Sequence, residues 1–140
     1  MQILNKLLTK AIFSEATNLN VSAVDLGKDM ISVRIRNEAV NRLEGATHTI
    51  ASANLYVLVE IVINILKTSP VFNQYLLAIQ QKAIIGGTIT LYDDRGNSYM
   101  ASDVSLNISE FPNMNGTEAS VNFSVLANFN VNTQLLSTDI

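Results

Sequence analysis

Residues 54–79 contain the feature that most restricts the possible folds, because a long strand pattern runs directly into the start of a helix. Apolar side chains alternate along residues 54–66 with the period of a β-strand, and only Lys67 and Thr68 separate them from Ser69-Pro70. Serine is a preferred N-cap, and proline fits the first helical turn, where a backbone N–H has no helical partner. The pattern predicts a strand over residues 54–66 that is followed at once by a helix.

The two faces of this strand differ in character. One face is entirely apolar, and the opposite face mixes polar and apolar side chains. The first comprises Leu55, Val57, Val59, Ile61, Ile63 and Ile65, and the second Asn54, Tyr56, Leu58, Glu60, Val62, Asn64 and Leu66. Thirteen residues also exceed the usual strand length of about five or six. Both properties suggest a sheet that continues beyond one copy of the chain.

Three further segments have clear patterns. In the helix, Phe72, Tyr75, Leu76, Ile79 and Ala83 form a stripe that can cover a sheet. Residues 88–92 and 97–106 flank an Asp-Asp-Arg-Gly sequence, which predicts a hairpin. Residues 118–132 alternate almost perfectly and predict a final strand with one apolar and one polar face.

The remaining segments are less regular. Residues 3–13 have helical spacing and predict a short amphipathic helix, or an arm that orders only against a partner. Residues 18–26 and 30–36 flank Gly27-Lys28-Asp29 and predict a second hairpin. Residues 37–44 fit either a strand or a loop, and residues 112–116 predict a turn. We expect residues 133–140 to be a flexible or interface-dependent tail.

Together these elements predict a mainly β fold with about seven strands around one flanking helix, closed as a β-sandwich or a curled barrel. With 140 residues, 48% of them hydrophobic, the chain can form one domain over residues 1–140, with residues 1–17 as an N-terminal helix or arm. Only 15% of the residues are charged, against about 25% in an average domain. Such a surface fits subunit packing, or a weakly charged monomer.

Composition also excludes several functions. A net charge of −3 with scattered basic residues argues against tight nucleic-acid binding, which needs clustered Lys and Arg. The absence of cysteine excludes disulfides and thiolate metal sites. No signal peptide or membrane-spanning segment is recognisable, which predicts a soluble protein made in a reducing cytoplasm.

Candidate catalytic and metal motifs are incomplete. His48 is the only histidine and has no neighbouring carboxylate or serine arranged as a catalytic pair. A calcium loop that begins at Asp93 lacks its usual residues at three positions, which are occupied by Arg95, Ser98 and Val104. We therefore predict no catalytic residue, no metal and no enzyme activity.

Two ligand-binding motifs fail on context. Gly86-Gly87-Thr88 ends a helix and begins a strand, which is the reverse of the order that places phosphate at a helix N-terminus. Phe123 and Phe129 lie on a uniformly apolar face without interleaved basic residues, so they indicate core rather than base stacking. No cofactor is predicted.

The order of elements resembles that of the tail tube proteins of contractile-tailed bacteriophages. The similarity covers residues 22–132 and is carried by VLVEIVINIL, which runs into LKTSPVFNQYLLAI, and by the later hairpin TLYDDRGNSYMAS. Residues 109–112 read Ser-Glu-Phe-Pro, where the family would carry an aromatic residue and a Lys/Arg-Pro pair. This departure leaves open a related tube-initiating protein of the baseplate.

The resemblance implies a structural virion protein that is assembled in the host cytoplasm. It implies six-membered rings that stack into the inner tail tube, a continuous inner β-barrel, and sheath and baseplate partners. Double-stranded DNA would pass through transiently and without specific binding, and no membrane insertion is implied. The alternative from another class is a monomeric β-sandwich binding module, although the chain lacks tryptophan and has four tyrosines.

One polar face is the candidate site. On the final strand we expect the face that carries Glu118, Ser120, Asn122, Ser124 and Asn128 to line the tube lumen or a subunit seam. A mildly acidic lining rich in Asn and Ser would let polyanionic DNA slide without adhering.

Overall fold

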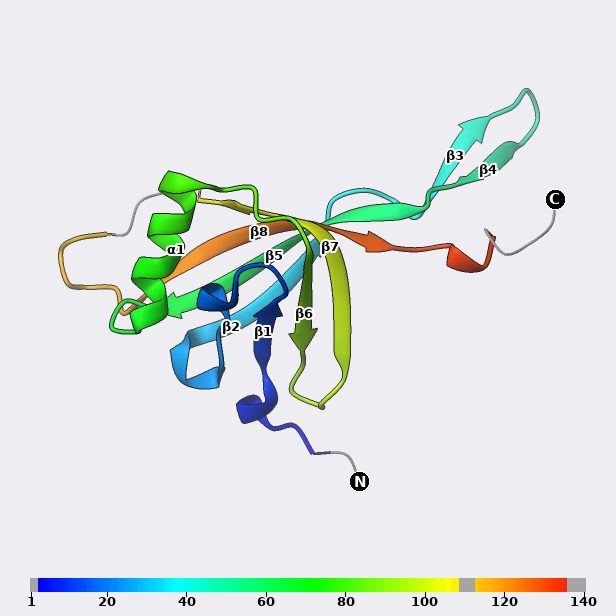
Figure 1. Cartoon of the computed structure of the whole chain (residues 1–140). Helices are drawn as coiled ribbons and strands as arrows, with labels where there is room; N and C mark the ends of the chain where they lie inside the picture. Colours follow the sequence, from blue (N-terminus) through cyan, green and yellow to red (C-terminus); the bar gives the residue numbers. More distant parts are fainter. Residues whose placement is uncertain (1–2, 109–112, 136–140) are drawn as a thin grey trace.

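The computed structural model describes residues 3–108 and 113–135, which form one six-stranded antiparallel sheet, a separate two-stranded hairpin and one α-helix (Figure 1). The sheet order is β1-β6-β7-β8-β5-β2, and β3 pairs only with β4. The strands are β1 Lys10–Phe13, β2 Leu26–Ile35, β3 Val40–Glu44, β4 Thr49–Ala53, β5 Tyr56–Leu66, β6 Thr88–Tyr92, β7 Ser98–Asn107 and β8 Ser120–Asn130, and the helix is α1 Pro70–Gln81. This confirms the predicted mainly β fold with one flanking helix, with eight strands in the described residues instead of about seven.

Strands β5 and β8 form the centre of the sheet. They pair along their whole length, from Tyr56 opposite Asn130 to Leu66 opposite Ser120. On one face most of their apolar side chains are buried, among them Ile61, Ile63 and Phe123, while Val121 and Phe129 are partly buried. The predicted long strand is therefore confirmed for Tyr56–Leu66, and its apolar face from Val57 to Ile65 is buried. Leu55, the first residue of the predicted face, precedes the strand and is 47% exposed.

Helix α1 packs on this apolar face. The Ser69 hydroxyl oxygen accepts a hydrogen bond from the Val71 N–H at 3.3 Å, as expected of an N-cap. Phe72 and Tyr75 are buried, with ring centroids 5.4 and 5.3 Å from that of Phe123. Burial raises the pKa of the Tyr75 hydroxyl far above its usual value, so this group stays protonated and donates to the Leu19 carbonyl at 2.8 Å.

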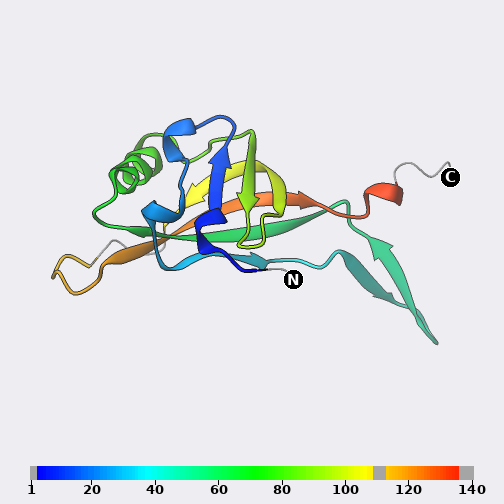
Figure 2. The ribbon, with the colours of Figure 1, turned by 90° about the horizontal axis from the view of Figure 1, so that it is seen from below.

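The sheet folds over on itself at β7. The register between β7 and β8 shifts between Ser102 and Ser105, and Asp103 has a left-handed φ of 56°. Beyond this bulge β6 and β1 lie on the same side of the sheet as α1 (Figure 2), and Ile89 joins the common core. The result is sandwich-like, with α1, β1 and β6 covering one face of β5 and β8.

The predicted helix over residues 3–13 is wrong. Only residues 6–8 form a 3₁₀ turn, and residues 10–13 form β1, which pairs with β6. Ala11 and Phe13 alternate into the core, whereas Ile3, Leu4 and Leu7 are exposed. A helix would have turned the two buried residues toward different directions, so tertiary burial decides the strand.

The predicted hairpin around residues 27–29 is also wrong, because these residues lie inside β2. Residues 27–30 bulge opposite a single residue, Asn64, and Met30 has a φ of 51°. An added Cβ on Gly27 would lie 2.7 Å from the Ser120 Cβ and would also overlap the Asn64 side chain. The glycine is therefore needed for close approach inside a strand, and no turn forms there.

The open choice for residues 37–44 is settled in favour of a strand. Val40–Glu44 forms β3, and the polar segment that follows forms β4 after a turn in which the Gly45 N–H donates to the His48 carbonyl at 2.7 Å. Of the predicted turn at residues 112–116 the structure describes residues 113–116. Thr133–Leu135 is a 3₁₀ turn, and the rest of the predicted tail lies outside the described residues.

Candidate assembly surfaces

The face of β2, β5 and β8 that points away from α1 is here termed the far face. Alternation along the paired strands assigns its residues. They are Ser32, Arg34, Tyr56, Leu58, Glu60, Val62, Asn64, Leu66, Ser120, Asn122, Ser124, Leu126, Asn128 and Asn130. In the described part of the chain α1, β1 and β6 all lie on the opposite side of the sheet (Figure 2). The far face is thus broad and mostly uncharged, and Glu60 and Asn64 near its middle are buried by the side chains around them.

Four of the five predicted site residues lie on this far face. Ser120, Asn122, Ser124 and Asn128 follow one another along β8. Glu118 is exposed and precedes the strand. The structure therefore brings the four strand residues into one row and leaves the glutamate at its end.

Cross-strand contacts connect the far-face side chains. Asn64 donates from Nδ2 to Asn122 Oδ1 at 2.7 Å. Glu60 lies directly opposite Arg34 in the register and is ion-paired with Arg36 and, at 3.8 Å, with Arg34. The sequence shows these charged residues but not their pairing, because the pairing depends on the β2–β5 register that the bulge sets.

The two edges of the main sheet differ. The edge at β1 is covered, because Ala11 exchanges backbone hydrogen bonds of 3.1 and 3.0 Å with Val21. At the other end β2 has a neighbour only on its β5 side. The Arg36 N–H points to the Leu58 carbonyl, and N–H direction alternates along a strand, so the N–H groups of Val33 and Ile35 point outward. Such an open edge can pair with a further strand.

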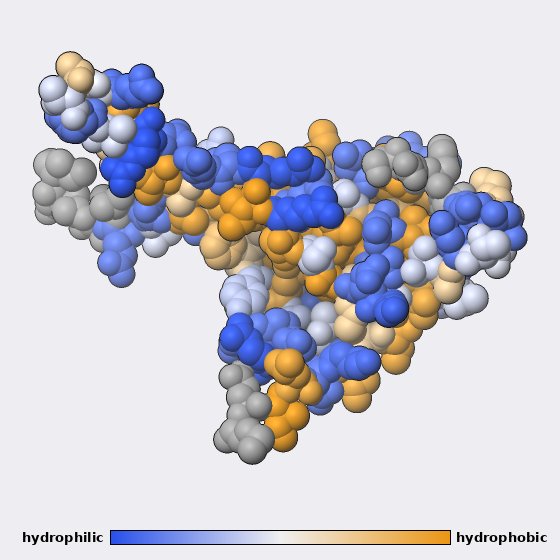
Figure 3. Space-filling model, turned by 180° about the vertical axis from the view of Figure 1, so that it is seen from behind, coloured by the Kyte–Doolittle hydropathy of each residue, from blue (hydrophilic) through white to orange (hydrophobic). Residues whose placement is uncertain are grey.

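An apolar groove of about 250 Å³ lies beside this open edge. Its lining is Val33, Ile35, Val59, Ile61, Leu91, Tyr99, Met100, Ala101 and Phe129. Ile35 is 70% exposed and Met100 60% exposed. In the space-filling view apolar side chains are visible between the long sheet and the part of the molecule that projects below it (Figure 3). A groove lined by exposed apolar side chains is a candidate interaction site.

The β3–β4 hairpin projects from the body (Figures 1 and 2). All ten of its strand residues are exposed. Leu43 and Ile50 lie directly opposite each other and are 54% and 53% exposed. At the base Asn132 donates from Nδ2 to the carbonyls of Ala39 and Asn54 at 2.9 and 2.6 Å. The hairpin is anchored at its base and has no packing along its length among the described residues.

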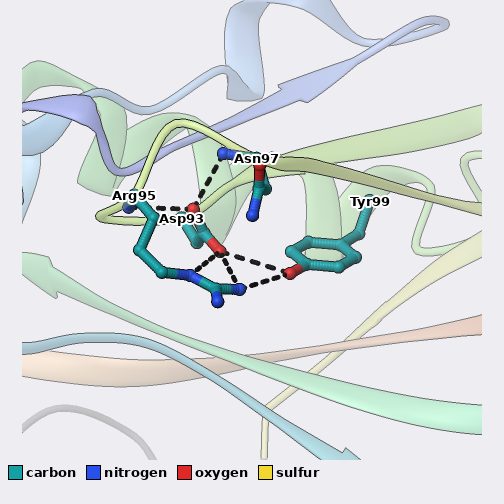
Figure 4. A network of polar contacts seen from close by, with 4 residues as sticks. All are labelled: Asp93, Arg95, Asn97 and Tyr99. Carbon is teal, nitrogen blue, oxygen red and sulfur yellow. Dashed lines mark hydrogen bonds and ion pairs between the residues drawn. The ribbon is translucent and has the colours of Figure 1, made fainter. Parts of the chain in front are cut away.

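The Asp93 turn is held by its own side chains (Figure 4). Asp93 Oδ1 accepts from the backbone N–H groups of Arg95 and Asn97, both at 2.9 Å, and Oδ2 accepts from the Arg95 guanidinium at 3.0 Å. Desolvation opposes ionisation of Asp93, but these bonds and the Arg95 charge outweigh it and hold its pKa below the usual value. Asp93 in turn raises the pKa of Arg95. The carboxylate thus serves as the acceptor that closes the turn.

Other candidate chemistry is dispersed. His48 lies in the β3–β4 turn, where its Nδ1 is 3.2 Å from Thr47 Oγ1. Within residues 3–108 and 113–135 no three His, Asp or Glu side chains gather where they could hold a metal ion. Among the same residues no helix has the length and apolar character needed to cross a membrane.

No protein-family model matches the sequence, and no curated protein matches it significantly. Four surfaces of the chain itself therefore bear on its function: the far face, the open β2 edge, the apolar groove and the projecting hairpin.

Proposed function

We propose that this protein is a self-assembling structural subunit whose rings stack into a tube, as in the inner tail tube of a contractile-tailed phage. The single observation that carries the proposal is the open edge of β2 at Val33 and Ile35, which lies beside the apolar groove. A strand edge and an apolar surface side by side supply both the hydrogen bonds and the burial that a subunit contact needs. Because the β1 edge is covered, β2 is the one edge of the six-stranded sheet that, in the described residues, is open to a neighbouring copy.

One-sided contacts favour closed rings. If β2 pairs with a different surface of the next copy, the contact is heterologous, and repeated heterologous contacts close into a ring when the rotation allows it. A ring that closes through the β2 edge would place the far faces of successive copies side by side, and the far face would then line one side of the ring. We assign that side to the lumen, with Ser120, Asn122, Ser124 and Asn128 in the lining.

The projecting hairpin supports assembly along a second direction. An isolated two-stranded hairpin is only weakly stable in water, and the exposed Leu43–Ile50 pair lacks cover in the described part of the chain. In the proposed tube a neighbouring copy covers this hairpin. Sheath and baseplate proteins are then the partners of the outer surface and of the tube end.

The chain could instead form only one ring of the tube, as a tube-initiating baseplate protein would. That alternative uses the same β2 edge and the same far face. A different candidate is a monomeric binding module, which the apolar groove favours as a site for a small apolar ligand. We favour assembly because the groove lies beside an unpaired strand edge, and because the projecting hairpin also offers exposed apolar side chains.

Electron microscopy with an edge-blocking variant tests the proposal. Purified wild-type protein should show six-fold rings or tubes, and isolated rings that do not stack would favour the initiator. Val33→Pro removes an outward N–H but leaves the β5 ladder in place, since proline is tolerated on edge strands. We expect this variant to remain a folded monomer. Monodisperse wild-type monomers at every concentration would contradict the proposal and favour the binding module.

A further inference from the structure

Four charged side chains in and beside the middle of the far face are connected to it by the contacts they make. They are Arg34 and Arg36, which are positive, and Glu60 and Asp103, which are negative. The Asp103 carboxylate accepts a hydrogen bond from Asn128 Nδ2 at 3.2 Å. Its contact is with this amide and not with the arginines. Both ion pairs of the arginines are made with Glu60.

The burial of these groups is unequal. Glu60 is only 9% exposed in the middle of β5, whereas the side chains of Arg34 and Arg36 are largely exposed. A buried carboxylate is costly unless it is paired, and two guanidinium groups pair with this one. Ion pairs with exposed partners add little to the stability of a protein. The main effect of the two Glu60 pairs is therefore on the net charge that the far face exposes to a ligand.

We infer that Glu60 is a charge-masking residue, which holds Arg34 and Arg36 against the sheet and thereby prevents the far face from retaining double-stranded DNA. The inference rests on the proposed tube, in which the far face meets DNA. Free arginines would contact phosphates and release counterions, and each such contact steepens the salt dependence of binding by about 0.9 in log–log slope. With Glu60 in place the two arginines are already engaged by a carboxylate.

The matched test compares two variants that remove the same charge at different places. Glu60→Gln unmasks the arginines, and Glu44→Gln removes an exposed carboxylate at the end of β3, away from the far face. Binding of a fluorescent duplex is followed by anisotropy at about 50 and 200 mM salt. We expect Glu60→Gln to bind about tenfold more tightly at the lower salt and to lose several-fold of that gain at the higher salt. Glu44→Gln should behave like the wild type.

Two further variants link the effect to the arginines. Adding both Arg34→Gln and Arg36→Gln to Glu60→Gln removes the two unmasked guanidinium groups and should return binding to the wild-type level. Glu60→Asp keeps the charge but moves it one methylene away from the guanidinium groups, so its affinity should lie between those of the wild type and Glu60→Gln. Circular dichroism confirms folding of each variant, and Glu60→Asp carries the test if Glu60→Gln does not fold.

The outcomes separate this inference from the proposed function. If Glu60→Gln binds DNA no better than Glu44→Gln, or if the wild type already binds as tightly, the masking role is refuted. Neither result depends on ring formation, because the duplex is offered to the purified protein in solution. If Glu60→Gln binds the duplex more tightly but electron micrographs show no rings, only the proposed tube is refuted.

Discussion

The β5–β8 pair and the β3–β4 pair are both antiparallel ladders, but only the first has a buried face. Ile61, Ile63 and Phe123 are fully buried between the sheet and the elements that cover it. In β3 and β4 every residue is exposed, and the hairpin is held at its base by Asn132. The same local geometry therefore stabilises the monomer in one place and offers a surface to a partner in the other.

The largest expected effect comes from truncating matched isoleucines in the two ladders. Ile63→Ala removes a fully buried side chain and should lower the free energy of unfolding by about 2–5 kcal/mol. Ile50→Ala, on the hairpin, should leave monomer stability within about 0.5 kcal/mol of the wild type. Urea denaturation of dilute protein measures both values, and electron microscopy at high concentration reports assembly. Equal destabilisation by the two changes would break the comparison.

A smaller effect is expected at the β2 bulge, which sets the register of the far face. Gly27→Ala introduces a Cβ that overlaps Asn64 and lies 2.7 Å from the Ser120 Cβ, so the strands must move apart. We expect a loss of about 1–3 kcal/mol in the free energy of unfolding. Gly116→Ala is the control, because a Cβ there would meet nothing within 4 Å and the strain is confined to its positive φ. If Gly27→Ala lowers the free energy of unfolding no more than Gly116→Ala does, Gly27 does not fix the register.

The smallest effect is expected in the β6–β7 turn. Because Asp93 has a lowered pKa in the folded state, its contribution to stability is complete above the unfolded carboxyl pKa and is lost as the pH falls through the lower folded value. The wild type should therefore lose stability in acid relative to Asp93→Asn, and the difference between the two should shrink below the ordinary carboxyl range. Thermal melting across acidic pH values measures this, and a constant difference would contradict the role of the ionised carboxylate.

Period-2 patterning predicted much of the fold because it reports burial directly. The long strand, which covers residues 56–66 of the predicted 54–66, the Ser69 N-cap, the Asp93 hairpin and the polar row on β8 are all present. Helical spacing gave the wrong element for residues 3–13. The same residues also fit a strand, because Ala11 and Phe13 alternate into the core against β6. The predicted hairpin turn at Gly27 is also wrong, because this glycine is required for close packing against Asn64 and Ser120 and not for a turn.

Two parts of the candidate site were outside the reach of pattern analysis. The β3–β4 hairpin has no buried face, so its sequence carries no clear alternation between core and solvent. The pairing of Glu60 with Arg34 and Arg36 depends on a register that four bulged residues shift. Both features require knowledge of which strands are neighbours, and a single sequence does not contain it.

Hydrogen exchange before and after assembly tests the central claim most directly, namely that a second copy completes the surfaces that one copy leaves open. In dilute protein we expect protected amides in β5 and β8 and rapid exchange in β3, β4 and the outward-facing positions of β2. In assembled protein β3, β4 and the Val33 and Ile35 amides should become protected, with β5 and β8 little changed. Assemblies in which these segments still exchange rapidly would contradict the account.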